Sequence, residues 1–336
     1  MTAELSLPLN LGHYDHRNGL FNPKDELSDP FYRAIIQSRF FRRLADVRFL
    51  GAIDYIVMPN QHISARRNSR YAHTLGVAAL TKRICRNLDI SKQTERLLVS
   101  SALLHDIGHG PFSHSSEKAF FQIFGFGHHE MTRSIIYGRY GSKINEILRF
   151  FKISPFDVCA MLTGESSSPH VLLFSSPVNV DTLDAIPRAY SYIASRLTAP
   201  VPDKYINDIV NTGLHSEKRL DGFWNIKNDV YKRLIFGHSG AMVDCSCKNF
   251  ITRNAHNFKK EDFLLSDSEF FTRYPAWRRE LRHLADILAP INFAPPCVGD
   301  LHGNISDTIY FVNRQQRLHS RNDIGKRYLK RKPHTL

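Results

Sequence analysis

The sequence contains few cysteines. Its 336 residues include five, at positions 85, 159, 245, 247 and 297. This odd, scattered set argues against a framework of disulfides and is typical of reduced thiols. Cys245 and Cys247 have no second cysteine pair or spaced histidine pair close to them in the sequence. We therefore interpret these two residues as structural rather than zinc-binding.

Long apolar segments are also missing. The longest ones, Ala52–Met58 and Val171–Phe174, fall far short of the ~20 residues that a membrane-spanning helix needs. The first residues, MTAELSLPLNLGHYDH, lack the basic start and the continuous apolar core of a signal peptide. We therefore expect a soluble, cytoplasmic protein with no membrane partner.

Acidic residues are fewer than basic ones. Asp and Glu total 32 against 45 Lys and Arg, which gives a formal net charge of +13. This imbalance favours polyanionic partners such as nucleotides, nucleic acid or acidic surfaces, and it says nothing about the fold. The hydrophobic share of 42% over 336 residues is ample for a packed core.

Strand-like patterns are scarce, and the main periodicity is helical. Apolar residues recur at spacings of three and four from Tyr32 to Val47, and an apolar stripe that starts at His73 continues to residue 88. Residues 91–107 predict a further helix with Ser91 as its N-cap. The segment AIDYIVMPN, which ends at residue 60, looks extended, and helical periodicity returns in 130–163 and from residue 171. The predicted fold class is mostly α, a helical bundle.

These patterns divide the chain into four parts. Residues 1–28 predict an irregular arm and residues 29–200 a helical core. Residues 201–313 predict a largely helical extension, with helices over 222–245 and 275–289 and a short strand over Thr308–Val312. Residues 314–336 are strongly basic, and we interpret them as a solvated tail in preference to a nucleic-acid contact.

The most informative segment is LLHDIGHGPFSH, residues 103–114. His105 and Asp106 stand at the end of a helix, which the following glycines stop. Neighbouring ligands cannot share a helix face, but at a fraying end both can converge on one ion. His73 upstream and Asp181 downstream can complete the set. Two imidazoles and two carboxylates make a mixed site suited to Mn, Fe, Zn, Ni or Co.

Other titratable residues can serve a reaction at this site. Four protein ligands leave positions for water and a phosphate oxygen if the ion is octahedral, so metal-activated water can attack phosphorus. Groups that titrate near neutrality can protonate a leaving oxygen or neutralise a polyphosphate. Glu117, one helical turn beyond His114, can orient that imidazole. Arg70 can bind a phosphate through two parallel N–H hydrogen bonds. The candidate histidines are His109, His114 and His129.

The segment VDTLDAIPRAY places Asp181, Asp184 and Arg188 on one side of a helix. We interpret Asp181 as the fourth metal ligand and the other two as an internal ion pair that fixes the helix. Pro187 within this segment predicts a local kink. Each signal alone is weak, because buried histidines are more often structural and His-Asp pairs arise by chance. Their combination is specific to a metal site.

The same residues resemble the HD superfamily. The closer resemblance is to its deoxynucleoside triphosphate triphosphohydrolase branch, which includes the sterile-alpha-motif-linked HD enzymes and bacterial relatives. It extends from about residue 16 to about residue 195 and is carried by SRFFRRLADVRFLG, SRYAHTLGV, LLHDIGHGPFSH, GHHEMTRSII and NVDTLDAIPR. The resemblance implies an HD-domain helical bundle and a homo-oligomer.

The resemblance also assigns roles to single residues. Glu117 stands where the family usually has Asp, and His129 aligns through the following Glu130, with His128 as a substitute. Arg70 matches an arginine that contacts phosphate. The implied metal ligands are His73, His105, Asp106 and Asp181, and the histidines that work near the phosphates are His109, His114 and His129.

The departures from the family concern the substrate. Phe49 stands where relatives carry a Gln that reads the deoxyribose, and Ala185 and Ala189 replace an aromatic residue and an Asp. Thr182 replaces a phosphate-binding Lys. The metal and phosphate residues match while much of the sugar-reading set does not. This pattern argues against ordinary deoxynucleoside triphosphates as the substrate.

We therefore predict a metal-dependent phosphohydrolase that hydrolyses a nucleotide phosphoester or phosphoanhydride by metal-activated water. The most specific version of this prediction is a triphosphohydrolase that releases tripolyphosphate. One alternative is an HD-type nuclease or cyclic-nucleotide phosphodiesterase, which the net charge of +13 and the basic tail favour. The other is a non-catalytic nucleotide sensor whose metal is structural.

Overall fold

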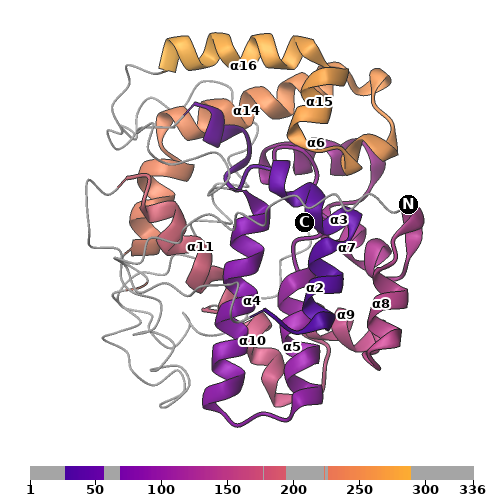
Figure 1. Ribbon diagram of the computed structural model, residues 1–336. Coiled ribbons are helices and arrows are strands. Elements are labelled where there is room, and N and C mark those ends of the chain that lie inside the picture. The colour runs from indigo at the N-terminus through magenta and orange to yellow at the C-terminus, as the bar shows by residue number, and fades with distance from the viewer. Residues whose placement is uncertain (1–26, 57–68, 177, 194–222, 224–225, 289–336) are drawn as a thin grey trace, which may run out of the picture.

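The computed structural model describes residues 27–56, 69–176, 178–193, 223 and 226–288 (Figure 1). Its long central helices are α4 (Arg70–Asn87) and α5 (Lys92–Leu104), which pack on each other. The remaining helices are α2 (Pro30–Gln37), α3 (Arg39–Arg43), α6 (His114–Phe124), α7 (His128–Ile136), α8 (Ile144–Phe150), α9 (Pro155–Thr163), α10 (Leu172–Ser175), α11 (Val180–Tyr190), α14 (His238–Arg253), α15 (Asp267–Arg273) and α16 (Pro275–Leu288).

The helices form two groups in space. In Figure 1, α4 and α5 run down the centre, with α11 on one side and α8 and α9 on the other. The C-terminal helices α14, α15 and α16 lie across the top of this bundle, where α14 packs on α6. The ends of α4 and α5 that carry the sequence motifs lie toward this upper group. The predicted mostly α fold is thereby confirmed.

Serine side chains set the starts of both central helices. The Ser69 hydroxyl accepts a hydrogen bond from the Ala72 N–H at the start of α4, and the Ser91 hydroxyl accepts one from the Thr94 N–H at the start of α5. Each bond pairs an N–H that has no partner inside the helix. The predicted Ser91 cap is confirmed. The end of α5 comes at Leu104, three residues earlier than the predicted helix, with His105 as its C-cap.

Two predictions for the N-terminal part are wrong in detail. The helical pattern between residues 32 and 47 is interrupted at Ser38, whose extended backbone ends α2 and whose hydroxyl caps α3. The segment over residues 52–60 was predicted to be extended, but its first residues belong to a 3-10 turn over Gly51–Tyr55, and residues 57–60 lie outside the described residues. The Asp54 carboxylate stabilises this turn because it accepts a hydrogen bond from the Leu50 N–H at 2.7 Å. Such local side-chain bonds compete with extended structure.

The C-terminal predictions have mixed outcomes. The helix expected over 275–289 is α16. The helix expected over 222–245 is divided, because a π-helical turn (Tyr231–Ile235) ends at Phe236 and α14 begins at His238 after an extended Gly237. Pro187 lies within α11, which continues past it to Tyr190. The predicted strand at Thr308–Val312 and the basic tail lie outside the described residues.

An aromatic cluster joins the upper helices to the bundle. The Phe112 side chain is fully buried, and its ring meets the rings of Phe270, Phe271 and Trp277 edge-on at centroid distances of 5.3, 5.0 and 5.9 Å. Edge-to-face contacts of this kind add stability beyond the apolar area that they bury. Among the described residues, every helix is too short or too polar to cross a lipid bilayer.

Replacing Leu103 by Ala should test how far the fold depends on the buried side of α5. Leu103 is 0% exposed, so the substitution leaves a cavity and should lower the free energy of unfolding by about 2–5 kcal/mol. Urea unfolding measures this change. The matched control is Leu172→Ala, because Leu172 is 60% exposed and its loss should cost less than about 0.5 kcal/mol. Equal losses in the two variants would contradict the assignment of this core.

Candidate metal centre and active site

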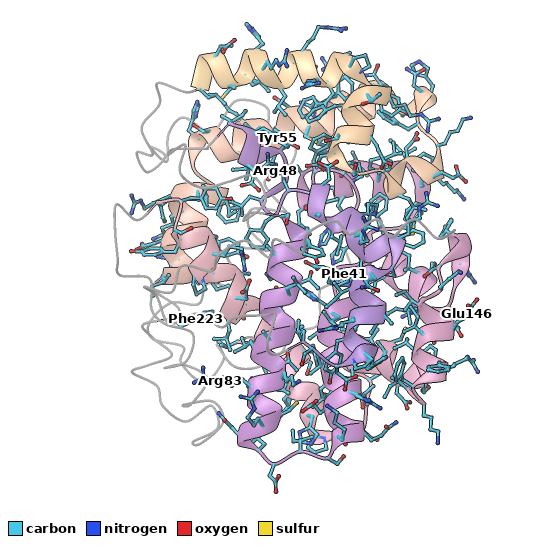
Figure 2. The ribbon with its side chains drawn as sticks, in the orientation of Figure 1. Phe41, Arg48, Tyr55, Arg83, Glu146 and Phe223 are labelled. Carbon is cyan, nitrogen blue, oxygen red and sulfur yellow. The ribbon has the colours of Figure 1, made fainter. Side chains whose placement is uncertain are left out.

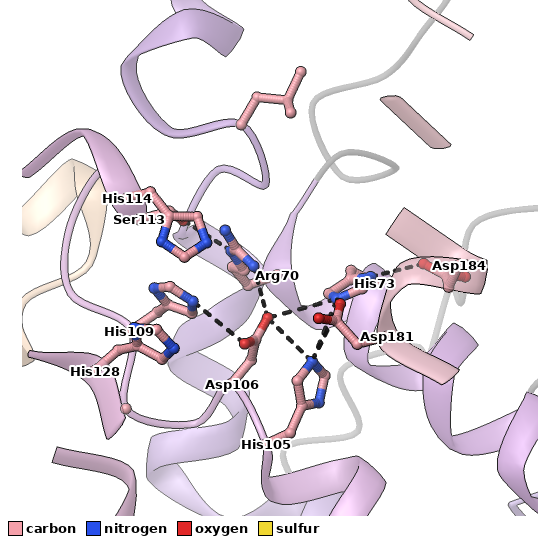
Figure 3. A network of polar contacts seen from close by, with 12 residues as sticks. Arg70, His73, His105, Asp106, His109, Ser113, His114, His128, Asp181 and Asp184 are labelled. Atoms are coloured by element: carbon pink, nitrogen blue, oxygen red, sulfur yellow. Dashed lines mark hydrogen bonds and ion pairs between the residues drawn. The ribbon is translucent and has the colours of Figure 1, made fainter. Parts of the chain in front are cut away.

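The predicted metal ligands come together from three helix ends. His73 lies in the first turn of α4, His105 and Asp106 follow α5, and Asp181 lies in the first turn of α11 (Figure 3). The His73 Nε2 atom is 3.3 Å from His105 Nε2, 3.6 Å from Asp106 Oδ2 and 3.1 Å from Asp181 Oδ1. The structure therefore brings these four side chains to one point.

The start of α11 explains how Asp181 is placed. The Asn179 side-chain oxygen accepts a hydrogen bond from the Thr182 N–H at 2.8 Å, and the Thr182 hydroxyl accepts one from the Asn179 N–H at 3.0 Å. This reciprocal cap fixes the first helical turn. Thr182 therefore has a local structural role here.

Hydrogen bonds fix the orientation of both imidazoles. His73 Nδ1 lies 2.7 Å from Asp184 Oδ2, and His105 Nδ1 lies 2.8 Å from the Ala102 carbonyl oxygen. Both partners only accept hydrogen bonds, so each Nδ1 carries a proton and each ring directs its Nε2 atom toward the other candidate ligands. Nitrogen and carboxylate oxygen atoms this close repel one another unless a proton or a metal cation lies among them. The residues present thus fit a divalent transition metal.

The carboxylates give this site a negative potential. Burial lowers the pKa of His105, but the Asp106 and Asp181 carboxylates outweigh it and raise that pKa to about 9. Burial acts in the opposite sense on Asp106, whose pKa is nevertheless held well below its usual value by His105 and Arg70. Both shifts show that positive charge is stabilised at this point.

Asp184 connects the metal ligands to an outer layer of residues. Its carboxylate accepts the His73 Nδ1–H and also pairs with the Arg188 guanidinium at 2.9 and 3.1 Å. The expected ion pair is therefore present, and the contact with His73 is a role that the sequence analysis missed. Gly76 makes room for it, because a Cβ atom there would lie 2.1 Å from Asp184 Oδ1.

Phe49 and Arg70 cover the other side of His73. The Phe49 ring lies 4.8 Å from the His73 ring, and the Arg70 guanidinium lies over Phe49 at 5.1 Å. Arg70 donates hydrogen bonds to Asp106 Oδ2 at 2.7 Å and to the Ser113 hydroxyl at 2.9 Å. Its side chain is 5% exposed. Arg70 is thus part of the wall of the site.

A second group of side chains lies beside the metal ligands. Glu117 contacts His114 Nδ1 at 3.0 Å and His128 Nδ1 at 2.5 Å, and the rings of His109 and His128 stack with centroids 4.1 Å apart. Burial opposes the charge on Glu117, but the hydrogen bonds from His114 and His128 hold its pKa far below the usual value. This carboxylate therefore stays ionised and orients both imidazoles.

His109 differs from its neighbours because it is fully buried without a hydrogen bond. Among the described residues, neither of its ring nitrogens has a hydrogen-bond partner. Its Nε2 atom lies 3.3 Å from Asp106 Oδ1, outside hydrogen-bonding geometry. Burial, together with the nearby Arg70, lowers the pKa of His109 well below its usual value. A buried polar group of this kind is costly unless another molecule supplies the partner.

The structure places His128, rather than His129, against Glu117. His129 is exposed, and its ring lies 3.9 Å from that of His128. Adjacent residues on a helix point in different directions, so only one of the two can face Glu117. The start of α7 determines which one: Gly127 is the N-cap, and a Cβ atom there would lie 2.7 Å from Glu117 Oε1. The glycine before His128 was the signal that could have favoured it.

Comparison with known proteins agrees with this geometry. Residues 70–158 match the model of the HD domain family. The chain carries an HD domain. The resemblance to the HD superfamily is thereby confirmed, and HD-domain relatives with assigned activities include the deoxynucleoside triphosphate triphosphohydrolase SAMHD1 homolog of Dictyostelium discoideum. It is 32% identical over 107 residues, which cover 29% of this chain and 20% of that protein.

Other relatives of this HD-domain protein cover more of its length. The uncharacterized protein YwfO of Bacillus subtilis is 30% identical over 194 residues, or 52% of this chain and 42% of YwfO. The chain thus spans less than half the length of these curated relatives. A solved phosphohydrolase structure from Bacteroides thetaiotaomicron has a similar fold, with a TM-score of 0.57 over 78% of this chain and 73% of that one, at 15% identity.

Replacing Asp184 by Asn should weaken metal binding without removing a metal ligand. The variant loses the charge that makes His73 a stronger ligand, so the affinity for Mn²⁺ should fall about 10–100-fold. Chelator competition measures the affinity. The control is Asp157→Asn, an exposed carboxylate in α9 that should leave the affinity unchanged. Equal affinities in all three proteins would contradict this role for Asp184.

Proposed function

We propose that this HD-domain protein is a metal-dependent phosphohydrolase acting on a phosphoester or phosphoanhydride of a nucleotide-like small molecule. The observation that carries the proposal is the buried imidazole of His109, whose ring nitrogens make no hydrogen bond within the described residues and whose Nε2 atom lies 3.3 Å from Asp106 Oδ1. A phosphate oxygen bound in front of the metal ligands would supply the missing partner for His109. A purely structural metal site would not need such a group.

In this proposal, His73, His105, Asp106 and Asp181 hold a divalent Mn, Fe, Co, Ni or Zn ion. When bound, such an ion polarises a phosphoryl oxygen and makes water a better nucleophile. The protein side chains supply the rest. Arg70 keeps Asp106 oriented through a 2.7 Å hydrogen bond, and His109 donates a hydrogen bond to the phosphate.

Glu117 prepares two imidazoles for proton transfer. Because it accepts the Nδ1–H of His114 and His128, each ring presents Nε2 to its surroundings. Burial lowers the pKa of His114 to about 4, although its hydrogen bond to Glu117 acts in the opposite sense, so this ring is neutral near pH 7. His128 is buried beside His109, whereas the His114 side chain is 42% exposed and, as a neutral ring, can accept a proton during the reaction.

Similarity to known proteins suggests a nucleotide substrate. Besides the Dictyostelium relative, the deoxyguanosinetriphosphate triphosphohydrolase-like protein of Caldanaerobacter subterraneus is 34% identical over 104 residues, which cover 30% of this chain and 27% of that protein. A triphosphohydrolase that releases tripolyphosphate is the sharpest form of the proposal. The buried Phe49 has no polar atom with which to bind a sugar hydroxyl, so we propose a substrate other than an ordinary deoxynucleoside triphosphate.

Nucleotide panels test this function directly. Protein loaded with Mn, Fe, Co or Ni should release phosphate or tripolyphosphate from at least one modified or unmodified nucleotide, as product chromatography would show. Asp106→Ala should reduce the rate to background because it removes a ligand and frees Arg70, while Asp157→Asn should retain it. Cleavage of oligonucleotides or cyclic nucleotides alone would favour the phosphodiesterase alternative. Metal binding without any turnover would favour the sensor.

His128 and His129 provide a matched pair of variants. His128→Gln removes the ring that bonds Glu117 and stacks on His109, so kcat should fall about 10²–10⁴-fold. His129→Gln changes an exposed neighbour and should alter kcat by less than about threefold. Steady-state kinetics with the same metal loading measures both. The reverse order would restore His129 as the working histidine.

A further inference from the structure

The turn that carries His109 ends in a strained backbone. Phe112 and Ser113 have φ values of 58° and 48°, in a region that residues with a side chain seldom adopt. Such conformations persist only where the surroundings hold them, and they are common at functional sites. The contacts of this turn should therefore show what keeps His109 in place.

Asp267, the first residue of α15, holds the turn from outside the matched HD domain. Its side chain is fully buried, and its Oδ1 atom accepts a hydrogen bond from the Phe112 N–H at 2.7 Å. Its Oδ2 atom accepts hydrogen bonds from the Arg48 N–H at 3.1 Å and the Tyr55 hydroxyl at 2.9 Å. The Arg48 and Tyr55 side chains lie beside each other below α14 and α15 (Figure 2). One carboxylate thus joins three segments.

A chain of hydrogen bonds connects these segments to the metal ligands. The Ser113 hydroxyl donates to the Arg48 carbonyl oxygen at 2.5 Å and accepts from Arg70 Nε at 2.9 Å. Arg70 then donates from Nη1 to Asp106 Oδ2 at 2.7 Å. Figure 3 shows Ser113, Arg70 and Asp106 in this order. A shift of Asp267 would therefore move groups that contact the proposed metal and phosphate.

The opposite side of the turn is held in the same way. Arg43 in α3 donates hydrogen bonds to the carbonyl oxygens of Ile107 at 3.1 Å and His109 at 2.5 Å. It also donates to the Leu265 carbonyl oxygen at 3.0 Å, two residues before Asp267. The segment that precedes α15 is thus bonded to the turn through Arg43, and the turn cannot move independently of it.

We propose that Asp267 is a positioning residue of the active site, through which the C-terminal helices hold His109, Ser113 and Arg70 in their working geometry. This inference rests on the proposed phosphohydrolase function. It makes the segment that runs from Leu265 into α15, which lies outside the HD-domain match, part of the catalytic unit. Asp267 contacts neither a metal ligand nor the proposed substrate position.

Asp267→Asn tests this role, because an amide has one acceptor oxygen and cannot serve Phe112 and Arg48 together. The matched control is Asp262→Asn. Asp262 is also fully buried, and it accepts hydrogen bonds from the Lys259 N–H and the Tyr274 hydroxyl. It also pairs with Arg273 at 2.7 Å, and no contact between its side chain and the turn is found among the described residues. Both variants should lose stability, and only Asp267→Asn should affect the site.

Three measurements distinguish the variants: hydrogen exchange at Phe112, tripolyphosphate affinity and kcat. The Mn²⁺ content is a fourth value, which should stay the same in both variants. In Asp267→Asn, the amide of Phe112 should exchange hydrogen for deuterium at least tenfold faster, and the affinity for inorganic tripolyphosphate should fall at least fivefold. With a nucleotide that is turned over, kcat should fall at least tenfold. In Asp262→Asn, all four values should stay near those of the unchanged protein. Equal effects of the two substitutions would overturn the inference.

The design separates this inference from the proposed function. If no nucleotide is hydrolysed, exchange at Phe112 and tripolyphosphate binding still decide whether Asp267 positions the turn. If Asp267→Asn does not fold, Tyr55→Phe replaces it, because the loss of one hydroxyl weakens the anchor of Oδ2 and leaves the bond to Phe112 intact. This milder variant should lower the tripolyphosphate affinity at least twofold at unchanged Mn²⁺ content. An unchanged affinity would contradict the proposal.

Discussion

The convergence of four buried or half-buried polar side chains is the constraint on which the rest of the structure depends. His73 and His105 direct their Nε2 atoms at each other across 3.3 Å, with carboxylate oxygens of Asp106 and Asp181 nearby. Each group is held in this costly position from outside: Asp184 holds His73, Ala102 holds His105, and Arg70 holds Asp106. These four side chains could together hold a metal cation, which would offset the cost of bringing them to one point.

The same reasoning extends to the neighbouring histidines. Glu117 orients His114 and His128 by accepting their Nδ1 protons, while His109 is left without a hydrogen bond among the described residues. A protein can keep one such unpaired group buried when it recurrently binds a ligand that pairs with it. The metal ligands and the histidine cluster meet at Asp106, whose two oxygens face opposite sides. The two groups therefore form one site.

Local signals in the sequence were sufficient for much of this site. The Ser91 cap and the spacing of Asp181 and Asp184 each depend on residues a few positions apart, and the structure agrees with both. The predicted glycine stop is less exact, because α5 already ends at Leu104. The sequence is least informative where a single turn changes direction. Ser38 divides one apolar stripe into two helices, and the exact start of α7 decides whether His128 or His129 faces Glu117. Periodicity cannot resolve a shift of one residue.

Contacts between distant residues could not be predicted, and they determine the extent of the functional unit. The bond from Phe112 to Asp267 spans 155 positions, and the bond from Arg48 to Asp267 spans 219. Residues 70–158 contain the His-Asp motif but neither Asp181 nor Asp267. A fragment limited to that segment would lack a predicted metal ligand and the carboxylate that holds the strained turn. The smallest unit that retains this geometry therefore reaches from α3 to α16.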